Sequence, residues 1–467
     1  MSLDVFGKYL ASSDRPHLVG IGGVSMSPLA AILHDMKKTV TGSDISENPA
    51  IKELRERGIK IEIGHSAENI SGAGYIIRTA AAREDNIEIM AAREQNIPVF
   101  ERAEAWGYIM RRYREAICIS GVHGKTTTTS MTSHILLHAG VDPTIMIGGT
   151  LPVIKSGCHI GKGDIIVLES CEYYNSFHNF RPTTAVILNI DADHLDFFGD
   201  LDGLKCSFRK FASLVPESGR VICNGDDENT MSALNGLNRG LITFGFGENA
   251  RITDIPVNIR GTNLELAGQN PSMTVTRDGK DICKIRLQIP GMHNLTNALA
   301  AAAVCLNIGI SPKIIEEGLL SYSGVARRFD YKGSYNGAGV YDDYAHHPRE
   351  LGALLDAIST IDTYKRIILA FQPHTYSRTK ALFSEFAAVL KRADIVFLAE
   401  IYAARETNTV GITSTDLAAA VPGARCISDF SKLTDEIAAI AREGDIILTV
   451  GAGDIYKVGV ELVGRAD

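Results

Sequence analysis

Hydrophobic and polar residues follow two patterns that alternate along almost the whole chain. Short, nearly continuous apolar runs, such as residues 17–22 and 116–121, are separated by longer stretches with helical periodicity. Continuous apolar runs are typical of strands that are buried on both faces of a parallel sheet. The alternation of strand and helix therefore predicts an α/β fold. Similar runs lie at residues 75–80, 164–170, 184–190, 219–225, 365–371, 394–400 and 445–451.

The length of the chain and its glycine-rich turns predict three domains. A chain of 467 residues corresponds to two to four domains of about 100–200 residues each. We place the three domains at residues 1–112, 113–323 and 324–467. Within the second domain, residues 250–290 alternate more regularly and predict a small β-rich insertion.

Composition and charge exclude several classes of protein. Apolar residues make up 45% of the chain and charged residues 22%, as in ordinary globular proteins. The net charge is −8 and no lysine or arginine run stands out, so we expect no binding to nucleic acid. The longest apolar run is too short for a membrane span, and the N-terminus does not resemble a secretory signal. We therefore expect a cytoplasmic protein.

The eight cysteines form no C-x-x-C pair, and most lie in apolar runs. This pattern indicates buried, reduced thiols and argues against a disulfide framework or a zinc site.

The segment GVHGKTTTTS, residues 121–130, predicts a phosphate-binding loop. An apolar strand precedes it and a helical pattern follows it, which is the context that such a loop requires. The start of the helix would direct free N–H groups at an anion, Lys125 would reach the terminal phosphates, and Thr126 would ligate Mg²⁺. Ile119 occupies the position where a standard P-loop has its first glycine. The alternative is an ordinary turn with an exposed lysine.

The segment GIGGVSMS, residues 20–27, is similar to the dinucleotide-binding fingerprint. It follows a strand, and Asp44 ends the next apolar run. Ser25 stands at the third glycine position, so the match is incomplete. We interpret the turn as a diphosphate site, with a purely structural turn as the alternative.

Further polar clusters follow other predicted strands or begin helices. Such side chains meet at the carboxyl edge of an open α/β sheet, where ligands bind. Each cluster also has a simpler explanation, because loop carboxylates are often only solvated and asparagine often caps a helix. The candidates are Glu172, His194, His293, Asn294, Asn297, Arg328, Asp343, Tyr344, His346, His374 and Arg378.

Together these segments resemble the Mur ligases of bacterial cell-wall synthesis over essentially the whole chain. The resemblance rests on GIGG, G-x-H-G-K-T-T-T-T, NIDADHLD, HN-x-x-NALAA, RRF, DDYAHHP, FQPH and GAGDI, in the family's order. It implies a Rossmann-like N-terminal domain that binds a UDP-sugar, and a central ATPase domain of the P-loop type with a mostly parallel sheet. It also implies a Rossmann-like C-terminal domain that binds amino acid and nucleotide. The family's phosphate loop is shorter than the standard one, so Ile119 is compatible with it.

The resemblance implies a reaction in which ATP phosphorylates the lactyl carboxylate of UDP-N-acetylmuramate and the amine of L-alanine attacks the acyl phosphate. ATP and Mg²⁺ are the expected ligands, and we expect a monomer or a weak homodimer. The implied catalytic residues are Lys125, Glu172, His194, Arg328 and His346. The implied metal ligands are Thr126, Glu172 and His194.

The implied binding residues fall into three sets. The ATP set is Gly121, Val122, His123, Gly124, Lys125, Thr126, Thr127, His293, Asn294, Asn297, Arg328 and Asp343. The UDP-sugar set is Gly22, Gly23, Asp44, Thr79, Ala80 and His123. The amino-acid set is Tyr344, His346, His374 and Arg378.

The chain departs from the family's motifs at three places. Val122 replaces a threonine of the loop, and Thr375 replaces an arginine that often follows FQPH. Residues 171–174 read Cys-Glu-Tyr-Tyr where the family often has D-E-S-D, so Glu172 is kept and the flanking carboxylates are lost. We expect Arg378 to take a larger share of the substrate contacts.

Three other functions remain open from the sequence. A related ligase could add a peptide or another amino acid, since one methyl group gives only about 1–3 kcal/mol of discrimination. An NAD-dependent oxidoreductase would use the first glycine motif but not the lysine loop. A nucleotide-dependent switch would not need polar clusters in all three domains.

Overall fold

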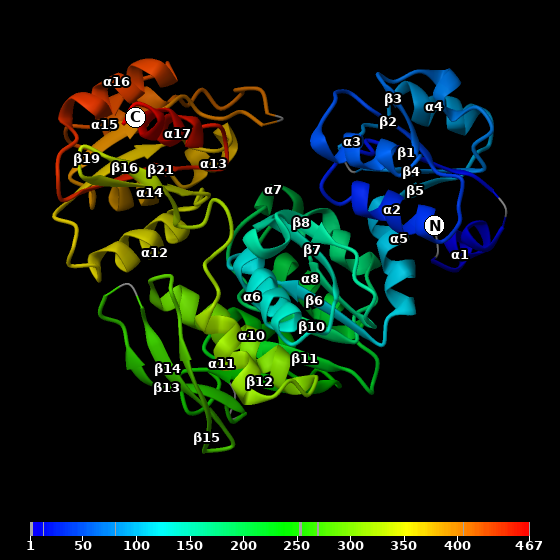
Figure 1. Ribbon diagram of the computed structural model, residues 1–467, viewed down its shortest axis with the longest axis horizontal. Coiled ribbons are helices and arrows are strands. Elements are labelled where there is room, and N and C mark those ends of the chain that lie inside the picture. Colours follow the sequence, from blue (N-terminus) through cyan, green and yellow to red (C-terminus); the bar gives the residue numbers. More distant parts are fainter. Residues whose placement is uncertain are drawn as a thin grey trace. The chain divides into compact units, whose positions relative to one another are not determined.

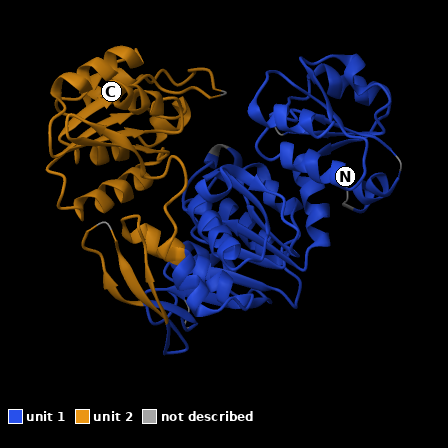
Figure 2. Cartoon of the chain, in the orientation of Figure 1, with its two compact units in different colours: residues 1–261, 276–282, 299–318 blue, residues 262–275, 283–298, 319–467 orange. Residues whose placement is uncertain are grey.

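The computed structural model describes residues 3–466 apart from residues 13, 80, 252–254, 269 and 405. The chain forms two compact units, which have different colours in Figure 2. Unit 1 comprises Met1–Gly261, Thr276–Ile282 and Leu299–Gly318. Unit 2 comprises Thr262–Val275, Cys283–Ala298 and Leu319–Asp467.

The N-terminal part of unit 1 is a parallel sheet with helices. Its strands are β1 (Pro16–Val19), β2 (Thr41–Asp44), β3 (Lys60–Ile63), β4 (Tyr75–Arg78) and β5 (Val99–Glu101). Its helices are α1 (Leu3–Ala11), α2 (Ser27–Asp35), α3 (Pro49–Glu56), η1 (Ala67–Ile70), α4 (Ile87–Glu94), α5 (Arg102–Ile109) and η2 (Met110–Arg112). The strand order is β3-β2-β1-β4-β5. The strand order reverses beside β1, and in open α/β sheets ligands bind near the carboxyl ends of the strands at such a point.

Residues 115–286 contribute the strands of a ten-stranded sheet (Figure 1). Its strands are β6 (Glu115–Ser120), β7 (Thr144–Leu151), β8 (Ser156–His159), β9 (Ile165–Glu169), β10 (Thr184–Ile187), β11 (Arg220–Asn224), β12 (Gly240–Gly245), β13 (Ile259–Glu265), β14 (Ser272–Arg277) and β15 (Lys280–Arg286). The helices of this region are α6 (Lys125–His138), η3 (Pro152–Ile154), η4 (Tyr173–Asn179), α7 (Leu195–Phe198), α8 (Leu201–Ser213), α9 (Glu228–Leu234), α10 (Met292–Asn307) and α11 (Pro312–Leu320). The order is β15-β14-β13-β12-β11-β10-β6-β9-β7-β8.

The middle of this sheet is fully buried, as its apolar runs predict. The side chains from Ala116 to Ile119 in β6 are 0% exposed, and Ala185, Val186 and Ile187 of β10 are equally buried. Fully burying one such valine or isoleucine contributes roughly 1.5–3 kcal/mol. The β-rich segment predicted at residues 250–290 exists, and its strands β13, β14 and β15 extend the central sheet rather than forming a sheet of their own.

The C-terminal sheet has six strands in the order β16-β17-β21-β18-β19-β20. The strands are β16 (Asp330–Tyr335), β17 (Ala338–Asp343), β18 (Arg366–Phe371), β19 (Ile395–Leu398), β20 (Arg425–Cys426) and β21 (Asp445–Val450). The helices are α12 (Pro348–Ser359), α13 (Tyr376–Ala381), α14 (Phe383–Leu390), α15 (Ser414–Ala419), α16 (Phe430–Ile440) and α17 (Tyr456–Gly464). Only the pair β16–β17 is antiparallel among the described pairs of this sheet.

Helices cover both faces of the C-terminal sheet, because successive side chains of a strand point to opposite faces. Leu369 and Phe371 of β18 belong to a core that includes residues of α12, α14 and α15. Ile368 and Ala370 belong to a second core with residues of α16 and α17. The predicted α/β fold is therefore confirmed, and every apolar run that predicted a strand contains one.

The prediction about the cysteines is partly wrong. All eight are free, as expected, but Cys171 and Cys206 are exposed and Cys158 and Cys426 are only half buried. Cys171 lies in the irregular segment after β9, and Cys206 lies on the outer side of the amphipathic helix α8. Among the described residues, each helix is too short or too polar to cross a bilayer.

Candidate functional site

Three adjacent parallel strands bring the phosphate loop and its neighbours together. β6 lies between β10 and β9, and both pairs are parallel. The segments that follow these strands therefore meet at one edge of the sheet. They carry the loop of residues 121–124, Glu169 and Glu172, and Asn189.

The phosphate loop has a backbone that depends on glycine. Gly121 has φ 140° and Gly124 has φ 82°, both in the region that favours glycine. α6 begins at the next residue, Lys125. Asn189 clamps the loop, because its Oδ1 accepts the His123 N–H at 2.8 Å and its Nδ2 donates to the His123 carbonyl at 3.0 Å. The strand, loop and helix predicted here are confirmed, and this arrangement suits an anion.

Lys125 lies at the start of α6 and faces a buried carboxylate. Its Nζ lies 3.0 Å from Glu172 Oε2, and it also donates to the carbonyl oxygens of Gly121 and Val122. Burial alone would lower the pKa of Lys125, but the charge of Glu172 raises it above its usual value. Glu172 is only 1% exposed. The ammonium group thus stays charged inside the protein because a carboxylate is paired with it.

Thr126 and Thr127 occupy the first turn of α6 and are both buried. The Thr126 hydroxyl donates to Glu169 Oε1 at 3.0 Å, and Glu169 Oε2 accepts the Gly148 N–H at 2.6 Å. A hydroxyl that donates its proton to a carboxylate keeps its lone pairs free for a cation.

His194 and His123 also lie at this edge. His194 Nε2 is 3.9 Å from Glu172 Oε1, and His123 Nε2 is 3.2 Å from Asp191 Oδ2. The described part of unit 1 therefore brings together Lys125, Thr126, Glu172 and His194, as the sequence predicts.

The glycine turn of residues 20–23 follows β1, and α2 begins beyond it at Ser27. The Gly22 N–H donates to Asp44 Oδ2 at 2.8 Å, and Gly23 donates to the Gly20 carbonyl at 3.2 Å. The Thr79 N–H donates to the Val19 carbonyl at 3.1 Å, which brings the end of β4 beside the turn. The predicted residue Ala80 lies outside the described residues.

Unit 2 has its own polar cluster at the carboxyl ends of β17, β21 and β18. Asp343 ends β17 and accepts two backbone N–H groups, from Phe329 at 2.7 Å and from Ala345 at 2.8 Å. Burial raises the pKa of Asp343 to about 6, although the charge of Arg328 opposes this change. The Arg328 guanidinium lies 5.2 Å from the centre of the Tyr344 ring.

His346, His374 and Arg378 extend this cluster. His346 Nδ1 is 3.1 Å from the Tyr344 carbonyl, which can only accept, so Nδ1 carries the proton. Burial lowers the pKa of His346. The His346 and His374 rings are 5.6 Å apart, and Arg378 Nη1 is 3.1 Å from His374 Nδ1.

The predicted residues at the start of α10 belong to the same unit. Asn294 and Asn297 are buried, and Asn294 Nδ2 donates to the Pro290 carbonyl at 2.7 Å. The pKa of His293 is lowered, because desolvation and the charge of Arg328 disfavour the imidazolium. The charge of Arg328 therefore acts on His293.

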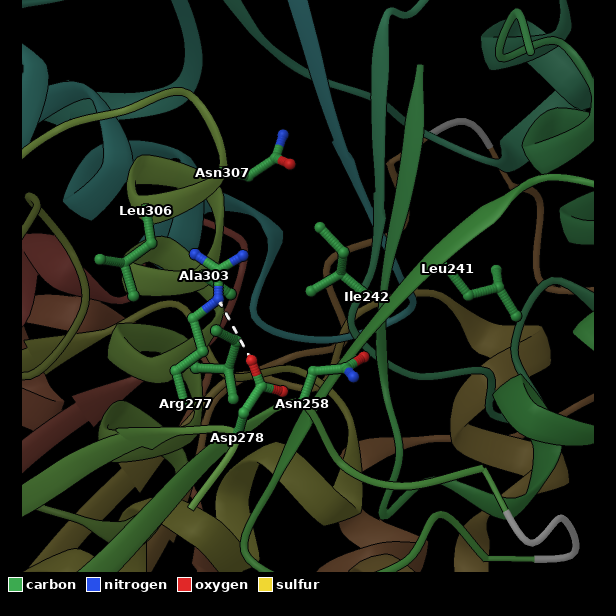
Figure 3. A pocket seen from close by; sticks show the side chains of 9 residues that line it. Leu241, Ile242, Asn258, Arg277, Asp278, Ala303, Leu306 and Asn307 are labelled. Atoms are coloured by element: carbon green, nitrogen blue, oxygen red, sulfur yellow. Dashed lines mark ion pairs between the residues drawn. The ribbon is translucent and has the colours of Figure 1, made fainter. Parts of the chain in front are cut away.

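A pocket of about 140 Å³ lies elsewhere in unit 1 (Figure 3). Arg277 and Asp278 form an ion pair of 4.0 Å at its edge, and Ala303 and Asn307 of α10 line it. The described lining of this pocket includes none of the predicted site residues.

Four residues to which the sequence assigned no role support the site. Glu169 and Asn189 support the phosphate loop, as described above. Arg327 donates from Nε to Asp342 at 3.1 Å and from Nη2 to the Gly451 carbonyl at 2.7 Å, which attaches the GAGDI segment to β17. Glu350 accepts the His346 N–H at 3.0 Å. Glu169 ends β9, Asn189 follows β10 and Glu350 lies in the first turn of α12, so their positions were the available signal. Glu169, Asn189 and Arg327 have partners on segments that are distant in the sequence.

The chain matches three family models in succession. Residues 15–114 match the Mur ligase family catalytic domain, residues 119–305 the Mur ligase middle domain, and residues 327–453 the Mur ligase glutamate ligase domain.

Similar proteins cover nearly the whole chain. UDP-N-acetylmuramate–L-alanine ligases from Caldanaerobacter subterraneus and Acetivibrio thermocellus are 44% and 45% identical, over 95% of this chain and 96% and 94% of their own. The crystal structure of UDP-N-acetylmuramate-alanine ligase from Thermotoga maritima superposes with a TM-score of 0.79 at 29% identity, over 97% of this chain and 99% of that one. A murein peptide ligase from Psychrobacter arcticus has the same fold, with a TM-score of 0.70 at 22% identity over 97% and 98% of the two chains.

Proposed function

This chain belongs to the Mur ligase family, and we propose that it joins L-alanine to the lactyl carboxylate of UDP-N-acetylmuramate, with hydrolysis of ATP to ADP and phosphate, in peptidoglycan precursor synthesis. The observation that carries the proposal is Lys125, which begins a helix after a glycine loop and is charged beside Glu172. It occupies that place in a chain that is 44% identical to a ligase of this name over 95% of its length.

In the proposed reaction, a carboxylate oxygen of the sugar attacks the γ-phosphorus of ATP and ADP leaves. The alanine amine then attacks the acyl phosphate, the amide bond forms and phosphate leaves. A carboxylate repels a triphosphate, so catalysis consists mainly of positioning and charge stabilisation. Lys125 and the N–H groups at the start of α6 would bind the terminal phosphates. On arrival of the phosphates, Lys125 would exchange its carbonyl partners at Gly121 and Val122 for phosphate oxygens.

The donor set near Lys125 fits Mg²⁺. Thr126, Glu169 and Glu172 supply oxygen atoms, which are the ligands that Mg²⁺ prefers. The imidazole of His194 is a ligand that transition metals accept more readily than magnesium. We propose Thr126, Glu172 and His194 as the metal-binding residues. Bound Mg²⁺ would neutralise charge on the transferring phosphoryl group. Glu169 would fix the direction of the Thr126 hydroxyl.

In unit 2, we assign the nucleotide contacts to Arg328, Asp343, His293, Asn294 and Asn297. Asp343 is presented rigidly by two backbone N–H groups, which suits a carboxylate that accepts ribose hydroxyls.

The alanine contacts are assigned to Tyr344, His346, His374 and Arg378. Alanine enters as an ammonium ion and must lose a proton before it attacks. His346 is neutral near pH 7 because its pKa is lowered. Its Nδ1–H donates to the Tyr344 carbonyl, so Nε2 is the nitrogen that would accept the proton from the alanine ammonium group.

The UDP-sugar contacts are assigned to Gly22, Gly23, Asp44, Thr79 and Ala80 in the N-terminal domain, with His123 on the sugar side. The Gly22 N–H already donates to the Asp44 carboxylate at 2.8 Å, near the carboxyl ends of β1 and β2. We further propose domain bounds at 1–112, 113–323 and 324–467, and a cytoplasmic monomer or weak homodimer.

Phosphate release from ATP tests the proposed function. Release should require both UDP-N-acetylmuramate and L-alanine, and mass spectrometry should show one new amide. Glycine, L-serine and an alanine-containing tripeptide serve as competing acceptors. A clear preference for the tripeptide would assign the chain to peptide ligation, and release without an amino acid would overturn the proposal.

A further inference from the structure

His194 has a backbone conformation that requires support from its surroundings. It precedes α7 with φ 53°, a left-handed conformation that costs a residue with a Cβ atom roughly 1–2 kcal/mol. Its Nε2 lies 3.9 Å from Glu172 and 3.8 Å from Asp193. The ring is therefore placed among carboxylates, and a strained residue at such a place is typical of functional sites.

An aromatic group packs against the face of this ring. Tyr173 stacks on His194 with ring centres 4.2 Å apart and an angle of 22° between the planes. The ring centres of Tyr173 and Tyr174 are 4.3 Å apart, and those of Tyr174 and Phe197 are 4.9 Å apart. We call Tyr173, Tyr174 and Phe197 the aromatic stack. The stacking contact covers a face of the imidazole, whereas both ring nitrogens lie on its edge.

The segment that carries Tyr173 is itself held in an uncommon shape. Tyr174 and Asn175 have consecutive φ values of 54° and 55°. The Asn175 N–H donates to the Glu172 carbonyl at 2.8 Å, which closes a turn around Tyr173. Glu172 and Tyr173 are neighbours in this turn, so the carboxylate that faces Lys125 and the ring that faces His194 have a fixed relation to each other.

We propose that Tyr173 is a positioning residue that orients the imidazole of His194 toward Glu172 for cation binding. The proposal rests on the proposed function, in which Glu172 and His194 are metal ligands. The Tyr173 ring would orient the imidazole by stacking on it. Tyr173 and Tyr174 lie in the segment where the motif of the family often has additional carboxylates. Partners that orient a metal-binding histidine raise metal affinity because they remove the rotational freedom that binding would otherwise cost.

The test compares Tyr173→Leu, Tyr173→Phe and the control Tyr174→Leu. Tyr174 is the matched control because it is the same residue type in the same turn and packs on Tyr173 and Phe197. The readout is binding of Mn²⁺, as a paramagnetic substitute for Mg²⁺, to the full chain with a non-hydrolysable ATP analogue, measured by electron paramagnetic resonance. A second readout is the Mg²⁺ concentration for half-maximal phosphate release, compared with kcat at saturating Mg²⁺.

Tyr173→Leu should weaken Mn²⁺ binding about tenfold and raise the half-maximal Mg²⁺ concentration by a similar factor. At saturating Mg²⁺, kcat should change less than about threefold, and Tyr173→Phe and Tyr174→Leu should bind Mn²⁺ within about twofold of the wild type. If Tyr173→Leu fails to fold in a thermal melt, Tyr173→Met also removes the ring while it keeps a long apolar side chain, and it should give the same loss of about tenfold.

Two results would overturn the proposal. Wild-type Mn²⁺ affinity in Tyr173→Leu would show that the Tyr173 ring does not orient His194 for metal binding. An equal loss in Tyr173→Phe would assign the effect to the hydroxyl rather than to the ring. Failure of the proposed function is distinguishable, because the wild type would then form no amide product, whereas the Mn²⁺ titration would still report on Tyr173.

Discussion

The phosphate-loop cluster of unit 1 (Lys125 and Glu172) and the histidine cluster of unit 2 (Asp343, His346 and His374) differ in whether burial favours the charged or the neutral form of their side chains. In unit 1, Lys125 is buried but paired with Glu172, so its pKa rises and the ammonium stays charged. In unit 2, burial outweighs pairing, so the pKa of Asp343 rises to about 6 and that of His346 falls. The first cluster therefore keeps a charged ammonium group that can bind a phosphate. In the second cluster, the neutral forms of Asp343 and His346 are favoured, which suits transfer of a proton.

The difference has a local origin in the partners of each group. Lys125 meets a side-chain carboxylate directly at 3.0 Å. Asp343 instead accepts backbone N–H groups, which are dipoles rather than charges and offset desolvation less completely. Four experiments test this comparison, and the largest expected effect comes first.

Lys125→Met should reduce ligation by about 10³-fold or more, because the terminal phosphates lose their cation. It should also lower the free energy of unfolding by about 3 kcal/mol, because Glu172 remains buried without a partner. Phosphate release and urea unfolding measure the two effects. Binding of UDP-N-acetylmuramate, followed by calorimetry, should stay close to that of the wild type.

The double variant Lys125→Met/Glu172→Gln is the control for the buried charge. It should recover most of the lost stability and none of the activity. If Lys125→Met formed ADP at the wild-type rate, the loop would not be the site that binds the terminal phosphates.

Thr126→Val and Glu169→Gln should each raise the Mg²⁺ concentration for half-maximal activity by about 10- to 100-fold. The first removes a hydroxyl oxygen, and the second removes the charged acceptor that directs it at 3.0 Å. Thr129→Val is the matched control, because that hydroxyl lies one turn later and donates to the Lys125 carbonyl. An equal effect in Thr129→Val would argue for general damage to α6.

Asp343→Asn should change how stability depends on pH. The folded pKa of about 6 lies above the ordinary value of about 3.9, so the folded state binds the proton more tightly. Wild-type stability should therefore fall as pH rises from about 4 through 6, by about 1–3 kcal/mol, and the variant should lack this component. Thermal unfolding of both proteins at pH 3, 4, 5, 6 and 7 measures the difference.

Asp445→Asn is a control in the same sheet, because the pKa of Asp445 is shifted in the opposite direction from that of Asp343. Burial alone would raise the pKa of Asp445, but hydrogen bonds from Arg366 lower it. The wild type should therefore lose this contribution as pH falls below about 4, and the Asn variant should not show the loss. Parallel pH profiles for Asp343→Asn and the wild type would contradict the contrast between the two clusters.

Val122→Thr should change kcat and the KM for ATP by less than about threefold, which is within about 0.7 kcal/mol. Threonine restores the residue that the family has at this position. The Val122 N–H donates to the Asn189 carbonyl at 3.2 Å, so the loop depends on backbone groups rather than on this side chain. Steady-state kinetics at several ATP concentrations provide the measurement, and a tenfold gain would show that the side chain contributes to phosphate binding.

The sequence by itself determined the nine strands that lie in its apolar runs, the phosphate loop and the helix that follows this loop. These features are local: apolar runs predict buried strands, and glycine or proline marks positions where the backbone is restricted. Lys125, Thr126 and Glu172 could be predicted for the same reason, because each lies at the end of a strand or the start of a helix.

Only the tertiary structure decided which groups became partners. Glu169 with Thr126, Asn189 with His123 and Arg327 with Gly451 join segments 43, 66 and 124 residues apart. The stack of Tyr173 on His194 likewise depends on β9 and β10 both pairing with β6. A pattern along the chain reports periodicity and local backbone preference, whereas a pKa, a hydrogen bond or a ring contact depends on distances that arise only when the strands align.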